Sequence, residues 1–198
     1  MEYRILGETG LKFSAISFRN YINSDKPDWQ ERTNQLVKKA NELGINFFDT
    51  AEVYGWGEGE KQLGTALKQL NIHREDLVIS TKLFWAVPDL KVNRTGLSRK
   101  HIIEGLNNSL AKLQLDYVDL VFCHRFDDET PLEEVCRTFD ALIKSGKAHY
   151  WGTSEWSACI FLNFTWYVKD SILLSQSWSN PNIPQFLINS IPDTKTIL

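Results

Sequence analysis

The chain has 198 residues, of which 42% are hydrophobic, and its 22 basic and 25 acidic residues give a formal net charge of −3. This size and charge balance predict one globular domain, or at most two small ones, and argue against nucleic acid as a partner. No window approaches the run of about 18 apolar residues that a membrane-spanning helix needs. The three cysteines, Cys123, Cys136 and Cys159, lack metal-ligand spacing and predict buried thiols in a reducing compartment. We therefore expect a cytoplasmic protein without a bound metal.

Helix and strand signals alternate in a regular order from about residue 15 to residue 155. Short apolar runs predict strands at 15–18, 45–48, 77–79, 117–122 and 149–151. Apolar residues at helical spacing predict helices over 29–43 and 58–70, a third helix capped by Ser98, and a fourth opened by Pro131. Single helices between strands imply right-handed parallel crossovers. The sequence thus predicts an α/β fold whose parallel sheet is either open or closed into a barrel.

Polar side chains stand at or just past the carboxyl ends of successive predicted strands. These residues are Asp49, with Tyr54 in the loop that follows it, then Lys82, His124 and Ser154. In a barrel such strand ends converge on one mouth, where active sites lie. An open dinucleotide-binding sheet would instead carry Gly-x-Gly-x-x-Gly after its first strand, and the sequence has no such motif there. The pattern therefore favours the barrel.

Five stretches of the chain carry a resemblance to a known family. They are 44–55 (GINFFDTAEVYG), 81–85 (TKLFW), 96–106 (GLSRKHIIEGL), 115–122 (LDYVDLVF) and 150–156 (YWGTSEW). With a few residues near the N-terminus they cover about 3–156 and resemble the aldo-keto reductase family. The likeness is greatest to its branch of voltage-gated potassium channel beta subunits and related plant-type reductases. It implies a (β/α)8 barrel of TIM type, closed at its bottom by an N-terminal hairpin over 3–13.

By this resemblance the catalytic residues are Tyr54, Asp49, Lys82 and His124. Tyr54 would donate a proton to a carbonyl oxygen while hydride from NADP(H) reaches the carbon. A tyrosine of ordinary pKa, about 10, is a reluctant acid, so the Lys82 ammonium would ease the loss of its proton. Asp49 would keep Lys82 charged and aimed, and His124 would orient the carbonyl. Channel beta subunits often have Asn at the position of His124, so His124 favours a working reductase.

The resemblance also implies a set of cofactor-binding positions near the nicotinamide. Arg19 stands beside them where the family usually has glycine, and its long side chain would either crowd the nicotinamide ring or lean outward. We expect His101, on the third helix, to face solvent. Glu155 follows the plant-type pattern, because channel subunits prefer Arg at that position. The implied cofactor-binding residues are Asn20, Tyr21, Asp49, Ser154 and Glu155.

The composition changes after about residue 156. Only four charged residues lie in 157–198, namely Lys169, Asp170, Asp193 and Lys195. The expected fifth helix is apolar nearly all round, which a helix on the outside of a barrel should not be. We therefore expect 1–156 to be a partial reductase domain of five to six βα units, and 157–198 to be an aberrant tail. One hypothesis is that the tail is read out of frame, which transcript sequence would test.

The leading interpretation is an NADP-dependent reductase of aldehydes or ketones. Its binding of NADP(H) would be weakened, because the family's sites for the cofactor pyrophosphate and 2′-phosphate lie mostly beyond the matching stretches. The second interpretation is a regulatory channel subunit that docks on voltage-gated potassium channel alpha subunits at the inner face of the membrane. A homo-oligomer is the alternative to this partner. The third is an inactive fragment. The identity of the carbonyl substrate is not readable from the sequence.

Overall fold

The computed structural model describes residues 1–7, 9–21, 28–87, 91–157 and 160, with the backbone alone at 173–176 and 187–188. The helices are α1 (Trp29–Glu42), α2 (Glu58–Gln69), α3 (Arg99–Leu113) and α4 (Leu132–Lys144). The strands are β1 (Tyr3–Ile5), β2 (Lys12–Ser14), β3 (Phe18–Arg19), β4 (Phe47–Asp49), β5 (Val78–Leu83), β6 (Val118–Cys123), β7 (Ala148–Ser154), β8 (Leu173–Gln176) and β9 (Leu187–Ile188). The predicted helices and strands up to residue 155 are all present, with shifted ends. The apolar fifth helix expected after residue 158 lies outside the described residues.

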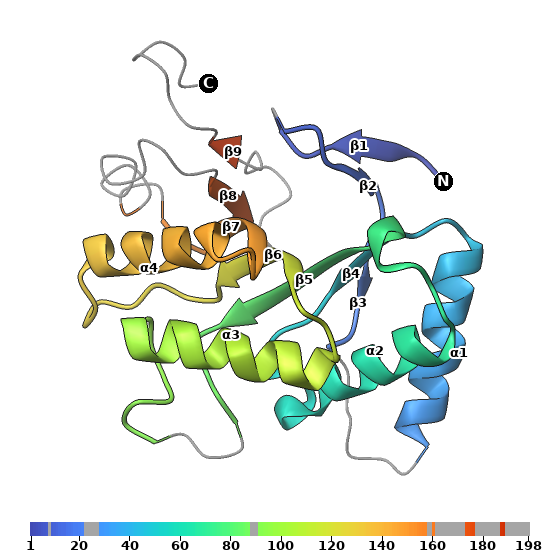
Figure 1. The fold of residues 1–198 in the computed structure, drawn as a ribbon, viewed down its shortest axis with the longest axis horizontal. Helices are drawn as coiled ribbons and strands as arrows, with labels where there is room; N and C mark the ends of the chain where they lie inside the picture. The colour runs from blue at the N-terminus through green and yellow to red at the C-terminus, as the bar shows by residue number, and fades with distance from the viewer. Residues whose placement is uncertain are drawn as a thin grey trace.

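The sheet follows the order of the chain. Strands β3 to β8 are parallel neighbours, and β9 runs antiparallel to β8 at the edge of the sheet (Figure 1). Strands β1 and β2 form a separate antiparallel hairpin, as expected over 3–13. The α/β fold with an incomplete set of barrel units is therefore confirmed. Over the ranges given above, no helix combines the length and apolar character that crossing a bilayer requires.

Helix α3 shows how local sequence sets these elements. The Ser98 hydroxyl accepts a hydrogen bond from the backbone N–H of His101, which satisfies one free donor of the first turn. Ile102, Leu106 and Leu110 then recur at helical spacing and are buried. The helix ends at Leu113, and the next residue, Gln114, adopts a left-handed conformation with φ of 57°.

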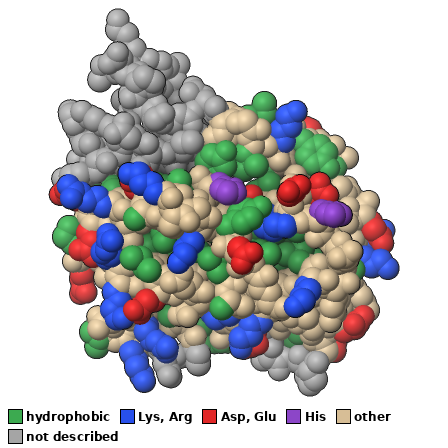
Figure 2. All heavy atoms as spheres, in the orientation of Figure 1, with side chains coloured by type: hydrophobic (Ala, Val, Ile, Leu, Met, Phe, Trp, Pro, Cys, Tyr) green, Lys and Arg blue, Asp and Glu red, His purple; other side chains and the backbone are tan. Residues whose placement is uncertain are grey.

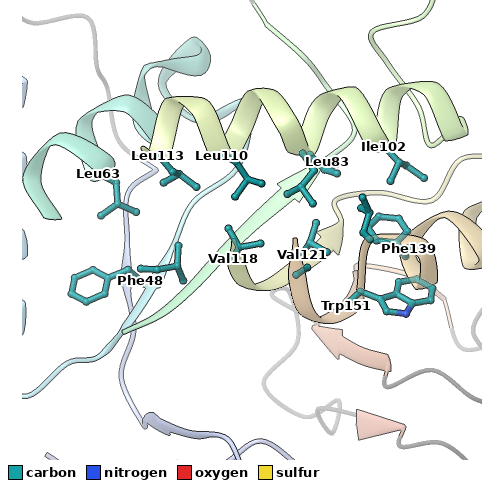
Figure 3. Packing of buried hydrophobic residues seen from close by; sticks show 14 of the residues in the cluster. Phe48, Leu63, Leu83, Ile102, Leu110, Leu113, Val118, Val121, Phe139 and Trp151 are labelled. Atoms are coloured by element: carbon teal, nitrogen blue, oxygen red, sulfur yellow. The ribbon is translucent and has the colours of Figure 1, made fainter. Parts of the chain in front are cut away.

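Alternation along the strands separates two layers of core. Val121 and Cys123 of β6 point toward the helices. Val118, the first residue of the strand, belongs to the same cluster, and Figure 3 shows it beneath Leu110 of α3. Leu120 and Phe122 point to the other face, where they pack with Leu6 and Val78 in a second cluster that the hairpin helps to cover. The burial of Cys123 and Cys136 agrees with the expectation of core thiols.

Charges of both signs are interspersed over the face of the molecule drawn in Figure 2. Lysine and arginine side chains alternate with aspartate and glutamate on the described part of that face. This distribution agrees with the nearly balanced composition of 22 basic and 25 acidic residues. Opposite charges at such spacing largely cancel at a distance, so this face gives little electrostatic steering of a polyanion.

Gly64 marks the closest approach of α2 to the end of α3. A Cβ built on Gly64 would lie 2.3 Å from the Leu113 carbonyl oxygen, a backbone atom that cannot move away alone. We expect Gly64→Ala to lower the free energy of unfolding by about 1–3 kcal/mol, the usual cost of overpacking, although alanine normally favours a helix. Urea unfolding would measure the loss. Gly10→Ala is the matched control, because a Cβ there meets nothing within 4 Å; a Gly64→Ala variant as stable as this control would contradict the expectation.

Candidate active site

The residues expected at the barrel mouth lie at the carboxyl ends of adjacent parallel strands. Asp49 ends β4, Lys82 is the penultimate residue of β5, His124 follows β6 and Ser154 ends β7. Arg19 ends β3 and pairs in register with Asp49. Parallel strands bring these ends to one edge of the sheet, so residues far apart in sequence share one site.

A buried ion pair between Lys82 and Asp49 forms the base of the site. The Lys82 Nζ lies 2.6 Å and 2.5 Å from the two carboxylate oxygens of Asp49 and donates a further hydrogen bond of 2.9 Å to the Thr50 carbonyl. Ser80 also donates to Asp49, at 2.5 Å. The side chains of Lys82 and Asp49 are 1% and 0% exposed, so the pair is shielded from water and salt. The three acceptors around Nζ match the three N–H bonds of an ammonium group.

Tyr54 lies directly above this pair. Its ring centroid is 4.8 Å from the Lys82 Nζ, and its side chain is almost fully buried. The Arg19 guanidinium donates a hydrogen bond from Nη2 to the Tyr54 hydroxyl oxygen. Arg19 therefore leans inward onto the expected proton donor. The sequence left the direction of the Arg19 side chain open, and the structure shows that it contacts Tyr54 directly.

The loop that carries Tyr54 is fixed by buried polar contacts. The backbone N–H of Glu52 donates to the Lys82 carbonyl at 3.1 Å. The Glu52 carboxylate accepts from the backbone N–H of Phe84 and lies 3.1 Å from His101 Nε2. His101 is only 2% exposed, so the expectation that it faces solvent is wrong. The helical pattern could not reveal that the polar partner of His101 is Glu52, which lies in a loop 49 residues earlier in the sequence.

Burial and neighbouring charges set the ionisation of the site. Burial, assisted by the Asp49 carboxylate, raises the pKa of Tyr54 well above its usual range, while Arg19 opposes this rise. Burial lowers the pKa of Lys82 to about 8, and Asp49 acts in the opposite direction. Burial also lowers the pKa of His124 to about 3, with Lys82, Arg125 and Arg19 adding to the effect. The His124 imidazole is therefore uncharged at physiological pH and can serve as a neutral hydrogen-bonding group.

An open cleft of about 650 Å³ gives access to Tyr54 and His124. The rings of His124 and Tyr54 meet edge to face at 5.8 Å, and Trp85 packs on His124 at 5.1 Å. The Nδ1 atom of His124 is buried and has no hydrogen-bond partner among the described residues. The residues that line the cleft are Arg19, Tyr21, Val53, Tyr54, Gly55, Trp56, Trp85, His124, Arg125 and Glu155.

The expected cofactor residues divide into two groups. Tyr21 and Glu155 line the cleft; Tyr21 is 60% exposed and packs edge to face on Tyr54, while Glu155 is paired with Arg125 at 3.2 Å. Asn20, Asp49 and Ser154 are buried and do not line it. The Asn20 side chain donates to the Gly59 carbonyl at 2.7 Å, which ties β3 to the start of α2.

Six residues that line the cleft were not predicted as site residues, and three of them, Arg19, Trp85 and Arg125, lie outside the loop that carries Tyr54. Each lies at or after the carboxyl end of a parallel strand: Arg19 in β3, Trp85 after β5 and Arg125 after β6. Their place at the carboxyl ends of predicted strands could therefore have identified them in the sequence as candidate site residues. The aromatic ring of Tyr21, which is 60% exposed, gives the cleft an apolar face against which a planar ligand group could stack.

The comparisons with known proteins agree with this geometry. A protein of Schizosaccharomyces pombe that bears the name of a voltage-gated potassium channel subunit beta is 50% identical over 157 residues, which are 79% of this chain and 46% of that protein. An Arabidopsis thaliana protein with the same kind of name is 46% identical over 158 residues, 80% of this chain and 48% of the relative. The chain thus spans about half the length of the curated relatives it matches.

A solved structure and a family model support the same grouping. The crystal structure of a thermostable aldo-keto reductase in complex with the inhibitor epalrestat superposes with a TM-score of 0.78 at 29% identity, covering 89% of this chain and 62% of that one. The model of the aldo/keto reductase family, whose members generally bind NADP(H), matches residues 22–174. The chain therefore belongs to the aldo/keto reductase family.

Proposed function

We propose that the cleft reduces an aldehyde or ketone to an alcohol, with Tyr54 as the proton donor. NADP(H), when bound, supplies the hydride that the carbonyl carbon accepts. The observation that carries the proposal is the stack of Asp49, Lys82 and Tyr54 at the foot of an open cleft, with His124 on its wall. This arrangement places an acid, a cation and a neutral hydrogen-bonding group around one point, as carbonyl reduction requires.

Each of these residues has a separate task in the proposed reaction. Tyr54 gives its hydroxyl proton to the substrate oxygen and becomes a phenolate, which later regains a proton from water. His124, uncharged at neutral pH, hydrogen-bonds the carbonyl and sets its orientation. Asp49 keeps the Lys82 ammonium charged beneath the ring, which favours the phenolate. Turnover of NADPH with a panel of aldehydes, followed by absorbance, tests the proposal.

The cofactor contacts that we propose are confined to its nicotinamide end. Tyr21 would stack on the ring, and Glu155 would line the approach. Ser154 would contact the amide group and Asn20 would shape the floor once binding of the ring uncovers these two buried side chains. Arg19 enters the same region and reduces the space for the ring. Because the proposed contacts reach only the nicotinamide end of this long cofactor, we expect this chain alone to bind NADPH weakly. Fluorescence titration would measure the affinity, and a submicromolar dissociation constant would contradict the expectation.

A second candidate function is that of a channel-associated subunit that senses the nicotinamide pool. The names of the relatives at 46–50% identity favour it. We propose voltage-gated potassium channel alpha subunits as partners in that case, at the inner face of the membrane, with homo-oligomers as the alternative. Co-purification with a channel tetramerisation domain, without turnover of aldehydes, would favour the subunit over the reductase.

The division of the chain at about residue 156 also stays a proposal. We propose that 1–156 forms the reductase part and that 157–198 is an aberrant, charge-poor tail. The charge content supports the division, with four charged residues in the tail. Strand β8, at Leu173–Gln176, lies within this tail and pairs in parallel with β7. A coding sequence whose alternative frame does not continue the family pattern would overturn the reading-frame hypothesis.

A further inference from the structure

Arg19 occupies an unexpected place at the centre of the cleft. Its Nη2 donates to the Tyr54 hydroxyl oxygen, and its Nε lies 3.7 Å from an Asp49 carboxylate oxygen. The guanidinium carbon is 4.9 Å from the ring centroids of both Tyr21 and Tyr54. These contacts fix a planar cation against the oxygen atom from which the proposed reaction takes its proton.

The backbone around Arg19 is held as firmly as its side chain. Arg19 pairs in register with Asp49, and the next residue, Asn20, donates its backbone N–H to the Asp49 carbonyl at 3.0 Å. The Asn20 side chain is anchored on Gly59 at the start of α2. Arg19 thus projects from a fixed strand end, so its position above Asp49 is set by the sheet.

The charges around Tyr54 show that Arg19 adds a net positive charge beside the phenol oxygen. Asp49 and Lys82 form a buried pair whose charges offset each other, and Lys82 directs three donors to Asp49 and Thr50. Arg19 is a second cation on the same carboxylate, so the group of three carries one net positive charge beside the phenol oxygen. Tyr21 and His124 also face Tyr54, and the Arg125–Glu155 ion pair lies in the cleft wall. None of these four adds a net charge at neutral pH, because both rings are uncharged and the pair is balanced.

We propose that Arg19 is a further catalytic residue of this chain, whose guanidinium hydrogen-bonds Tyr54 Oη and stabilises the phenolate left when the proton passes to the substrate. This inference rests on the proposed reductase function. Tyr54 has one O–H to donate and oxygen lone pairs to accept with, so the bond from Arg19 leaves the proton available for the substrate. The O–H bond of Tyr54 breaks, a new O–H bond forms on the substrate oxygen, and Arg19 stays protonated throughout. The role expected of Lys82 alone is thereby shared between two cations.

The test is a titration of the phenol at position 54 in the protein without cofactor. 3,5-Difluorotyrosine, whose phenol ionises at a lower pH than that of tyrosine, is placed at position 54, and the phenolate absorbance is followed against pH. We expect Arg19→Met to raise the phenol pKa by about one unit or more, which is at least a tenfold decrease in the acid dissociation constant of the phenol. Arg19→Lys, which keeps the charge and loses the planar fork, should give a smaller rise. Arg125→Met is the matched control for loss of a cleft guanidinium, because Arg125 pairs with Glu155 instead.

A pKa change in Arg19→Met no larger than that in Arg125→Met would overturn the inference. So would a higher kcat in Arg19→Met, because it would show that Arg19 only occupies space that the reaction needs. If Arg19→Met does not fold, a phenol pKa in Arg19→Lys equal to that of the unsubstituted protein overturns it. If Arg19→Met shifts the phenol as expected while the unsubstituted chain reduces no aldehyde, the proposed reductase function fails and the electrostatic role of Arg19 on Tyr54 stands.

Discussion

Tyr54→Phe is expected to lower kcat for NADPH-dependent aldehyde reduction by about 10²- to 10⁴-fold, the usual contribution of a positioned general acid. The change removes one oxygen atom, and with it the proton that the proposed reaction transfers. It keeps the ring that packs against Tyr21 and His124, so the walls of the cleft should retain their shape. Steady-state kinetics with a saturating aldehyde would measure the loss in kcat.

The control for Tyr54→Phe is Tyr3→Phe, which deletes a phenol oxygen far from the cleft. The Tyr3 hydroxyl donates to the Gly44 carbonyl at 2.8 Å, next to the N-terminal hairpin. We expect this variant to keep the activity of the unsubstituted protein, and both variants to show a cooperative thermal transition. Retention of more than half of the activity in Tyr54→Phe would show that another group donates the proton.

The architecture was predictable because it depends on patterns that are local in the sequence. The apolar stripe of α3, with Ser98 before it, defines a helix without tertiary information. The strand β6 is buried on both faces and reads as a nearly continuous apolar run. Strand ends were less accurate: β3 was expected at 15–18 and lies at Phe18–Arg19. A strand of two residues has too few positions to show a period.

The site was only partly predictable, because its contacts join residues from different elements. Asp49, Lys82 and His124 could be grouped from their places at strand ends, and the structure brings them together around Tyr54. The inward direction of the Arg19 side chain depends on the Asp49 carboxylate at the end of β4 and on the Tyr54 hydroxyl in the loop that follows. The burial of His101 depends in the same way on Glu52. Side-chain direction at such positions follows from tertiary partners, which periodicity does not encode.

Lys82→Met is expected to lower the free energy of unfolding by about 3–5 kcal/mol, the cost of leaving one member of a buried ion pair unpaired. Asp49 would keep Ser80 and Arg19 as partners but would lose the two short contacts from Lys82 Nζ. A loss of this size is a large share of the stability of an ordinary domain, about 5–15 kcal/mol. Urea unfolding followed by circular dichroism would measure it, and a loss below about 1 kcal/mol, the level of an exposed pair, would contradict the burial of the pair.

A double-mutant cycle separates the loss of the pair from the loss of one side chain. Asp49→Asn alone leaves a buried ammonium, and Lys82→Met alone leaves a buried carboxylate, whereas the combined variant leaves neither charge. We therefore expect the combined loss to be smaller than the sum of the two single losses. Lys100→Met is the control, because the Lys100–Glu104 pair is 56% exposed on both sides and its loss should cost at most about 0.5 kcal/mol. The contrast would show that the pair beneath Tyr54 owes its energetic weight to burial, the property that also lowers the pKa of Lys82.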